Sequence, residues 1–528
     1  MKKFIKILLV FVLISSCSSV KKYNEQISKL HTIEALRADI DNVYFQLKKH
    51  HPNLYQYTPK EILDFKFDSL KLSIKEPINS REFYKKLAPV VANVKQGHVS
   101  VGSAGKRYNK KERKQLSKKK FEFLDLGFEY LNEKLWVTKT KEKDNAIIGS
   151  EVIKIDNELV SSLVATYKTR FASDGYNKTL HNQYVGKVFS RLHLKEHGYL
   201  DSLQVTFKQQ DSIFTKMFKY VDKNKKQDSV SKKETVKVEK PKLTKAEKKA
   251  NRIANRNKRK YNKKHGLIKG DEFTRNFKFL ETDSRVAYMR IESFTNGNYK
   301  KFYKESFAIL DSLKTENFIL DLRDNGGGRI SEISYLYSFL AKEKFQLVKE
   351  SEVNSRLPYF DFLMSNTTPT SLKIASVLGS PMIVIHNLIK TKKREDRIYY
   401  NLRFSKEKEP NNLAYKGNLY VLINGGSFSA SALLSTHLKA TDRAVFVGEE
   451  TGGAYNGCVA GIYKIHQLPN SKLKIRMGLM QIETPYKQTP DGFGVMPDVE
   501  IAHTIEDIIN NGDPEIEWVL QRINSPDN

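Results

Sequence analysis

The chain has 528 residues with a formal net charge of +31, which is long enough for two or three domains and at least one sizeable core. The charge is unevenly spread, because residues 221–265 hold 18 Lys/Arg against 5 Asp/Glu, a surplus of 13. No base-stacking aromatic pattern accompanies the remaining charge, so we do not expect a nucleic-acid-binding protein.

The amino terminus has the pattern of an export signal. Three lysines precede an apolar run of about ten residues, which is too short to span a bilayer. Ile14-Ser-Ser-Cys17 then resembles a bacterial lipoprotein cleavage box. We predict that residues 1–16 are a lipoprotein signal peptide and that Cys17 is acylated. The protein would be exported to the cell envelope and held on the membrane by this anchor, facing the periplasm or the cell surface; the alternative is an ordinary signal with a chance cysteine.

The next part of the chain is expected to be helical and then β-rich. A polar tether is predicted for residues 18 to about 30, followed by helical apolar spacing over residues 33–95. Strand patterns follow to about residue 220, and residues 148–157 resemble the strand and turn of a PDZ module, which binds peptide ends at a sheet edge. The predicted domains are the tether and helical domain (17–115), a PDZ-like module (116–222), a basic insertion (223–265) and a catalytic domain (266–528).

The basic insertion, residues 223–265, has almost no aromatic and few large apolar residues. Such a composition favours a solvated segment that is disordered or a frayed helix. Contact with an anionic surface, lipid or polysaccharide, is an alternative role for it.

The carboxyl-terminal half alternates strand and helix patterns, which predicts an α/β sheet core. Apolar runs bounded by breakers predict strands, and the segments between them predict helices. The expected strands are 286–291, 318–322, 382–385 and 419–423, with helices at 299–314 and 330–342.

Two glycine turns in this half carry chemistry. Ser429 follows a buried strand and Gly425-Gly426 and starts a helix, which is how several hydrolases present a nucleophilic serine; a helix N-cap is the alternative. The second turn, Gly326-Gly-Gly328, closes another strand, and its amides can converge on an oxyanion. Arg329 follows it in place of Lys-Ser/Thr, so a nucleotide-phosphate loop is excluded.

Four segments in order resemble one serine peptidase family, which contains the C-terminal processing peptidases and the tricorn core protease. They are Asp321-Leu-Arg-Asp-Asn-Gly-Gly-Gly328, Ser427-Phe-Ser-Ala-Ser431, Val447-Gly-Glu-Glu-Thr-Gly-Gly453 and Gly492-Phe-Gly-Val-Met-Pro-Asp-Val499. The resemblance implies a crotonase-like α/β peptidase core, preceded by the helical domain and the PDZ-like module. It also implies Ser429 as the nucleophile, with an oxyanion hole formed by the amides of Gly326 or Gly327 and of Ala430.

The family's usual catalytic lysine is missing, because its place holds Ala454 in Thr451-Gly-Gly-Ala454. This departure points to the tricorn-like branch, which uses a histidine from the amino-terminal part. His98, in Gln96-Gly-His-Val-Ser100, fits that position as the general base. Asp491 fits the place of the acid that orients the histidine, with Glu483 as the alternative.

A short zinc-protease-like pattern, His193-Leu-Lys-Glu-His197, is interpreted as a chance match, so no metal and no cofactor is expected. The predicted function is hydrolysis of polypeptide substrates by a serine endopeptidase through an acyl-enzyme. The alternative is a catalytically weak protein of the same fold that binds polypeptide ends through its PDZ-like module.

Overall fold

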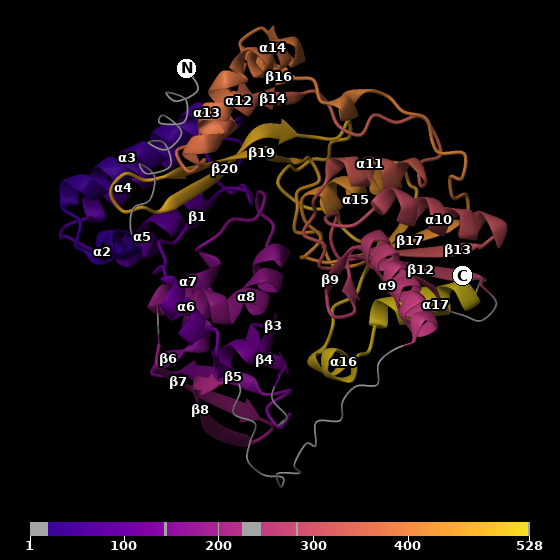
Figure 1. Ribbon diagram of the computed structural model, residues 1–528, viewed down its shortest axis with the longest axis horizontal. Helices are drawn as coiled ribbons and strands as arrows, with labels where there is room; N and C mark the ends of the chain where they lie inside the picture. The colour runs from indigo at the N-terminus through magenta and orange to yellow at the C-terminus, as the bar shows by residue number, and fades with distance from the viewer. Residues whose placement is uncertain (1–19, 142–144, 199, 224–243, 281–283, 526–528) are drawn as a thin grey trace.

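The computed structural model describes residues 20–141, 145–198, 200–223, 244–280 and 284–525 (Figure 1). The predicted signal peptide, Cys17 and the first half of the basic insertion lie outside these residues. No single helix among the described residues is long and apolar enough to cross a membrane, although one sharply bent pair, Thr370–Leu378 with Ser380–Lys390, passes the same test together.

The amino-terminal domain is helical, as its apolar spacing predicts. Thr32 and Asn79 cap the second and the fourth helix by accepting hydrogen bonds from backbone amides of the first turn. The predicted tether is shorter than expected, because Val20–Ser28 already forms a helix that buries Ile27. The helices are α2 (Val20–Ser28), α3 (Ile33–His50), α4 (Lys60–Ser73) and α5 (Ser80–Ala92).

The β-rich module that follows is one twisted sheet in the strand order β2-β8-β7-β5-β4-β3, with helix α8 packed on it. Phe189 of α8 and Phe207 of the sheet lie in its buried core. The elements are α6 (Lys110–Leu116), β2 (Lys119–Phe121), η1 (Glu122–Asp125), β3 (Gly127–Leu131), β4 (Lys134–Lys139), β5 (Glu151–Ile155), β6 (Glu158–Leu159), α7 (Val160–Lys168), α8 (Thr179–His197), β7 (Ser202–Gln209) and β8 (Ser212–Asp222).

The carboxyl-terminal half is built on a six-stranded sheet in the order β11-β12-β13-β17-β18-β21, parallel except for β11. Alternate residues of each strand enter different cores: Phe318 and Leu320 face one core, whereas Ile319 faces the core beneath α17. This confirms the predicted α/β class. The elements are β9 (Leu267–Lys269), β10 (Glu272–Phe273), β11 (Arg275–Phe279), β12 (Val286–Ile291), α10 (Tyr299–Ser312), β13 (Asn317–Asp321), α11 (Ile330–Ser338), β17 (Asn418–Ile423), α15 (Ala430–Ala440), β18 (Val445–Gly448), β21 (Val499–Glu500), α16 (Ile505–Asn510) and α17 (Pro514–Asn524).

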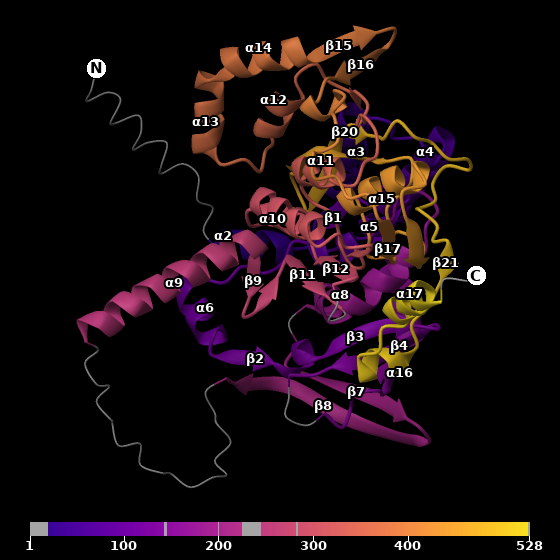
Figure 2. The same ribbon diagram turned by 90° about the vertical axis from the view of Figure 1, so that its right-hand side faces the viewer.

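The strand predicted at 382–385 is wrong. These residues lie in a helix that begins with Ser380-Pro381, and proline is well suited to a first helical turn. Since β13 pairs directly with β17, the sheet has no place for a strand between them. The segment instead forms an arm that stands away from the body (Figure 2). The arm comprises β14 (Ser351–Val353), α12 (Pro358–Leu363), α13 (Thr370–Leu378), α14 (Ser380–Lys390), β15 (Thr391–Arg394) and β16 (Arg397–Tyr400), followed by η2 (Arg403–Ser405).

The prediction of disorder is also wrong for the second half of the basic insertion, which forms the helix α9 (Lys245–His265). Thr244 and Glu247 form a reciprocal capping box at its start, and Gly266 ends it in the left-handed conformation. The helical alternative therefore describes this half.

A long hairpin joins the two ends of the chain. Strands β19 (Cys458–Gln467) and β20 (Lys474–Ile482) leave the catalytic half and reach the amino-terminal helices, where β1 (Ser100–Gly102) pairs antiparallel with β20 (Figure 1). Ile475 and Met477 of β20 lie fully buried in the same core as Leu47 and Phe83. The helical domain therefore depends on residues from the far end of the chain.

This dependence predicts a stability difference within one hairpin. Ile475→Ala should destabilise the protein by about 2–5 kcal/mol, because it leaves a cavity in the shared core. Ile465→Ala removes the same atoms from a side chain that is 39% exposed, so it should cost less than about 1 kcal/mol. Urea unfolding followed by circular dichroism measures both; equal losses would contradict the shared core.

Candidate active site

Ser429 lies at a sharp turn between β17 and α15. Its backbone adopts φ 57° and ψ −117°, and its side chain makes no capping hydrogen bond to the helix. A non-glycine residue at such a positive φ costs on the order of 1–3 kcal/mol, and this strain is typical of a serine presented on a nucleophile elbow. The N-cap alternative therefore does not hold for its side chain.

The glycine-rich turn after β13 supports this elbow. The Phe428 amide donates to the carbonyl of Asn325 at 3.0 Å, and the Ser427 hydroxyl donates to the carbonyl of Leu322 at 2.8 Å. A Cβ added to Gly327 would lie 2.8 Å from the Cβ of Ser429. Only glycine therefore allows the two turns to approach this closely.

His98 meets Ser429 across 331 positions of sequence. Its Nε2 lies 3.0 Å from the Oγ of Ser429, within hydrogen-bond distance. The imidazole is buried and packs between the rings of Phe428 and Tyr463, at centroid distances of 5.0 and 5.4 Å. The structure therefore brings together the two residues predicted as nucleophile and general base.

Asp174 supports the histidine segment from behind. This carboxylate, which sequence patterns did not single out, accepts a hydrogen bond of 2.7 Å from the backbone amide of Gly97. A Cβ at Gly97 would lie 2.6 Å from the Cζ of Phe428, so a larger residue before His98 would displace this ring. Burial raises the pKa of Asp174 to about 7.

The environment keeps His98 neutral. Burial, and then the positive charge of Arg476, lower the pKa of His98 to about 3. Neutral imidazole is the form that accepts a proton from a serine hydroxyl. The same shift makes folding less favourable as the pH falls from about 6.5 toward 3, since the unfolded chain then binds the proton more readily.

The second ring nitrogen of His98 faces a tyrosine instead of a carboxylate. The hydroxyl of Tyr463 lies 3.4 Å from Nδ1, a long hydrogen bond. When Nδ1 carries the proton, it donates to this hydroxyl and leaves Nε2 free to accept the serine proton. Tyr463 belongs to β19, and no sequence motif indicated it.

Asp491, the predicted third catalytic residue, is not hydrogen-bonded to His98 in the described part of the chain. Its carboxylate accepts hydrogen bonds from Gln56 and Asn456, both at 3.0 Å, and no hydrogen bond joins it to His98 among the described residues. The Oε1 of Gln56 in turn accepts from Gln96, two positions before His98. Asp491 therefore positions the histidine segment indirectly.

The alternative acid, Glu483, does not reach His98 either. Its carboxylate pairs with Lys487 at 2.8 Å and accepts a hydrogen bond of 3.0 Å from Gln481. Both predicted acids thus have other partners in the described chain.

The oxyanion-hole prediction also changes in part. The amide of Gly327 donates to the side chain of Asn325, two positions earlier, at 2.9 Å, so in this structure it already has a hydrogen-bond acceptor. Ala430 is the first residue of α15, and its amide has no acceptor within the helix. Gly328 and Ala430 line the same pocket as Ser429, whereas an added Cβ at Gly326 would face open space.

One comparison with known proteins matches the carboxyl-terminal part of the chain, which contains Ser429. Residues 285–501 match the family model described as peptidase family S41. These residues are an S41 peptidase domain. The match supports the predicted family for this part of the chain, as the domain of a serine-type peptidase.

Solved structures resemble the whole chain and not only the S41 domain. The crystal structure of mature CPAF is similar with a TM-score of 0.61 at 15% identity, over 94% of this chain and 99% of that one. Mature CPAF complexed with lactacystin gives 0.60 at 15% identity, over 93% and 98%. The photosystem II D1 C-terminal processing protease gives 0.41 at 14% identity, over 91% and 98%. No curated protein matches the sequence.

A pocket of about 330 Å³ opens beside Ser429 in the S41 domain. Its wall is mainly apolar and includes Leu433, Met480, Ile482 and the buried free thiol of Cys458. Such a pocket suits an apolar side chain of a bound polypeptide.

The position that holds the catalytic lysine elsewhere in the family has no room for a long side chain here. Ala454, which stands at that position, is buried, and a Cβ on the preceding Gly453 would lie 2.9 Å from the amide nitrogen of Ser429. A motif residue with another role is Asp321, whose pKa is held at about 2 by Arg323 and Arg290 against the opposing effect of burial. Asp321 is therefore ionised, and its interactions with Arg323 and Arg290 hold the backbone at the start of the glycine turn.

Two residues of the zinc-protease-like pattern, His193 and Glu196, make contacts that stabilise the fold. His193 hydrogen-bonds to Tyr167 at 2.9 Å, and Glu196 pairs with Arg170 at 2.8 Å. The described residues contain no group of three or more His, Cys, Asp or Glu side chains suited to a metal ion.

The charge next to His98 predicts a shift in pH dependence. Arg476→Met removes one of the two causes that lower the pKa of His98, so the acid limb of kcat/KM should move to higher pH. The pH profile of peptide hydrolysis measures this. Lys474→Met, two positions earlier on β20, serves as the matched control and should leave the limb in place; a limb that is unmoved in Arg476→Met contradicts the assignment.

Removal of the Tyr463 hydroxyl should weaken catalysis moderately. Tyr463→Phe keeps the ring packing but loses one neutral hydrogen bond to Nδ1, so kcat/KM should fall roughly five- to tenfold. Steady-state kinetics beside Asp491→Asn test this. An unchanged Tyr463→Phe together with a loss of about a thousandfold in Asp491→Asn would restore Asp491 as the partner of His98.

Proposed function

We propose that the chain is an exported, lipid-anchored endopeptidase that cleaves polypeptides through an acyl-enzyme on Ser429, with His98 as general base. The distance of 3.0 Å between Nε2 of His98 and Oγ of Ser429 carries this proposal. The strained backbone at Ser429 and the pocket beside it support the same assignment.

In the proposed reaction, Oγ of Ser429 attacks the peptide carbonyl carbon while His98 takes the hydroxyl proton. The amide of Ala430, with an amide of the glycine turn, stabilises the tetrahedral oxyanion; loss of one such donor typically costs about 3 kcal/mol. His98 then gives the proton to the leaving amine as the C–N bond breaks. Water, deprotonated by His98, attacks the ester and frees Ser429 with the carboxylate product.

Covalent labelling tests the dyad. A fluorophosphonate probe should label the wild-type protein, and Ser429→Ala should abolish labelling because the attacking oxygen is gone. His98→Ala should slow labelling by at least about a hundredfold through loss of the base. Ser431→Ala is the matched control, since this buried serine lies two positions away and should leave labelling intact.

Hydrolysis of an unfolded protein substrate should follow the labelling. If Ser429→Ala is still labelled, or if His98→Ala is labelled at the wild-type rate, the dyad is wrong. A well-folded wild type that neither labels nor hydrolyses would favour the alternative, a protein that binds polypeptide ends without cleaving them.

The proposed location rests on the amino-terminal sequence. Signal cleavage before Cys17 and acylation of its thiol would leave only Ser18 and Ser19 between the anchor and α2. Expression in a bacterium fed radiolabelled palmitate should give an acylated protein, and Cys17→Ala should lose the label while Cys458→Ala keeps it. Palmitate incorporation that persists in Cys17→Ala contradicts the anchor.

A further inference from the structure

Helices α13 and α14 of the arm expose a large apolar surface. Leu378, Met382 and Ile389 are 79%, 75% and 71% exposed, respectively. Contiguous exposed apolar surface of this kind marks a site of interaction. Its other exposed apolar members are Leu372, Ile374, Val377, Ile385 and Leu388.

The stretch around these two helices is positively charged, although Asp361 precedes it and Glu395-Asp396 follow it. Residues 362–394 contain five Lys/Arg and no Asp or Glu. Arg394 pairs with Glu350, whereas no ion pair involves the other four within the described part of the chain. Those four are Lys373, Lys390, Lys392 and Lys393. An apolar face bordered by unpaired cations is typical of a segment that lies in the interface of an anionic membrane.

Helix α9 adds a second cationic surface. It holds ten Lys/Arg against one Glu, and residues from Lys245 to Tyr261 are all exposed. Lys264 pairs with Glu305, and no other ion pair of α9 is present among the described residues. A helix of this charge is attracted to anionic headgroups.

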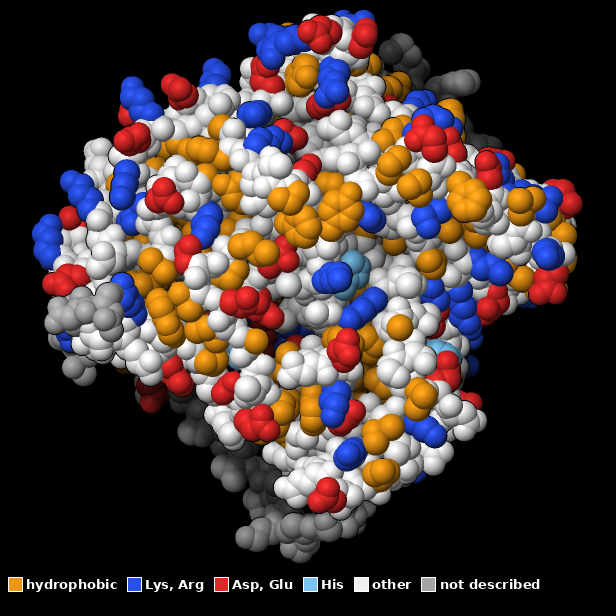
Figure 3. Space-filling view, turned by 180° about the vertical axis from the view of Figure 1, so that it is seen from behind, with side chains coloured by type: hydrophobic (Ala, Val, Ile, Leu, Met, Phe, Trp, Pro, Cys, Tyr) orange, Lys and Arg blue, Asp and Glu red, His pale blue; other side chains and the backbone are white. Residues whose placement is uncertain are grey.

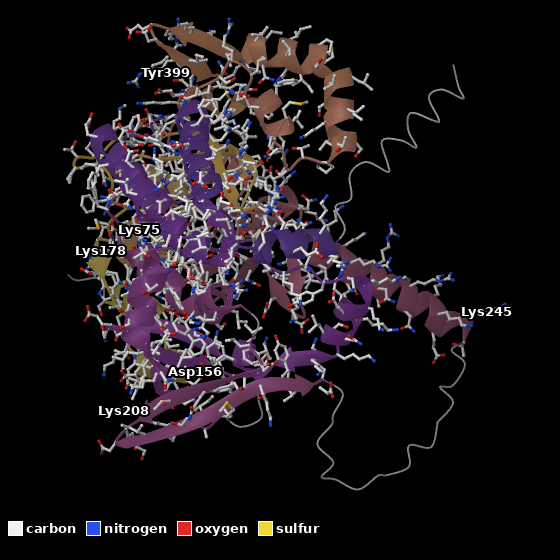
Figure 4. The ribbon with its side chains drawn as sticks, turned by 90° about the vertical axis from the view of Figure 1, so that its left-hand side faces the viewer. Lys75, Asp156, Lys178, Lys208, Lys245 and Tyr399 are labelled. Atoms are coloured by element: carbon white, nitrogen blue, oxygen red, sulfur yellow. The ribbon has the colours of Figure 1, made fainter. Side chains whose placement is uncertain are left out.

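Both surfaces lie on the same side of the molecule. Figures 2 and 4 agree that α9, α2 and the α13–α14 arm face one side, with Lys245 at the projecting end of α9. Helix α2 contains the first described residue, Val20. On the opposite side, seen from behind in Figure 3, acidic and basic side chains are intermingled.

We propose that this side, defined by α9 and the α13–α14 arm, binds to the surface of an anionic lipid bilayer. The arm inserts its apolar side chains between lipids, and α9 rests on the headgroups. The two arm helices are bent by 72° at their junction and neither is long enough to cross a membrane, so the contact is interfacial. This inference depends neither on acylation of Cys17 nor on peptidase activity.

Charge decides between lipid and a second copy of the chain. Two copies that met through this side would bring surfaces of the same sign together, which disfavours self-association. Anionic lipid supplies both the opposite charge and the apolar environment that the exposed side chains lack.

A probe on the arm tests the contact directly. The full chain carrying Cys17→Ala and Met382→Cys is labelled with an environment-sensitive fluorophore; the remaining Cys458 is buried. Vesicles of phosphatidylcholine mixed with phosphatidylglycerol should shift its emission to the blue, and vesicles of phosphatidylcholine alone much less. The same probe at Leu72→Cys, an equally exposed position on α4, should not respond. Residues 1–16 are common to both, so binding through them cannot create the difference.

Charge reversal tests the part played by α9. Arg252→Glu/Arg256→Glu/Lys260→Glu should raise the lipid concentration for half-maximal response about tenfold or more. Lys75→Glu/Lys178→Glu/Lys208→Glu makes the same change of charge on exposed side chains away from this side (Figure 4) and should have little effect.

Four results would overturn the proposal. The first is a probe at position 382, or at Ile389→Cys as a second position, that stays in water on anionic vesicles. The second is equal responses to neutral and anionic vesicles. The third is a dimer, measured by light scattering, that Leu378→Glu/Met382→Glu dissociates, which would assign the surface to a second copy. The fourth is loss of hydrolysis of a soluble substrate in that variant with an unchanged vesicle response, which would assign it to substrate.

Discussion

The antiparallel pairing of β1 with β20 is the interaction on which the active site depends. It aligns Ser100 with Arg476, and His98 stands two residues before that pair. The β19–β20 hairpin is in turn fixed at both ends, by the helical core that buries Ile475 and by the catalytic core that buries Ile482. The β19–β20 hairpin thus fixes the position of the helical domain, and with it His98, relative to the domain that contains Ser429. The same hairpin contributes Tyr463 and Arg476, which lie next to His98.

His98 is kept neutral, and no carboxylate is hydrogen-bonded to its ring among the described residues. A carboxylate beside an imidazole raises its pKa, whereas burial and a nearby guanidinium lower it. Here the second pair of influences prevails, and the pKa of His98 falls to about 3. Of the acids near the site, Asp174 accepts from the Gly97 amide and Asp491 accepts from Gln56, which in turn accepts from Gln96; neither acid has a hydrogen bond to the ring among the described residues.

The parts of the site that short sequence motifs encode could be predicted from the sequence. Ser429 and the glycine turn are local, and His98 followed from the absent lysine. The third residue was not predictable in this way, because whether Asp491 reaches His98 or Gln56 depends on packing between segments that lie far apart in the sequence, 435 positions for Gln56. The strand predicted at 382–385 failed because an apolar run alone does not distinguish a strand from an exposed helix. The start of α9, in contrast, could have been predicted from the sequence, because Thr244 and Glu247 have the spacing of a capping box.

The wide separation of nucleophile and base has a consequence for biosynthesis. The residues that hold His98 in place extend to Arg476 and beyond, so a nascent chain has no assembled dyad until most of it has been synthesised. Any hydrolysis that depends on His98 therefore begins only after the β1–β20 pair has formed, because a partly folded chain carries Ser429 without its base.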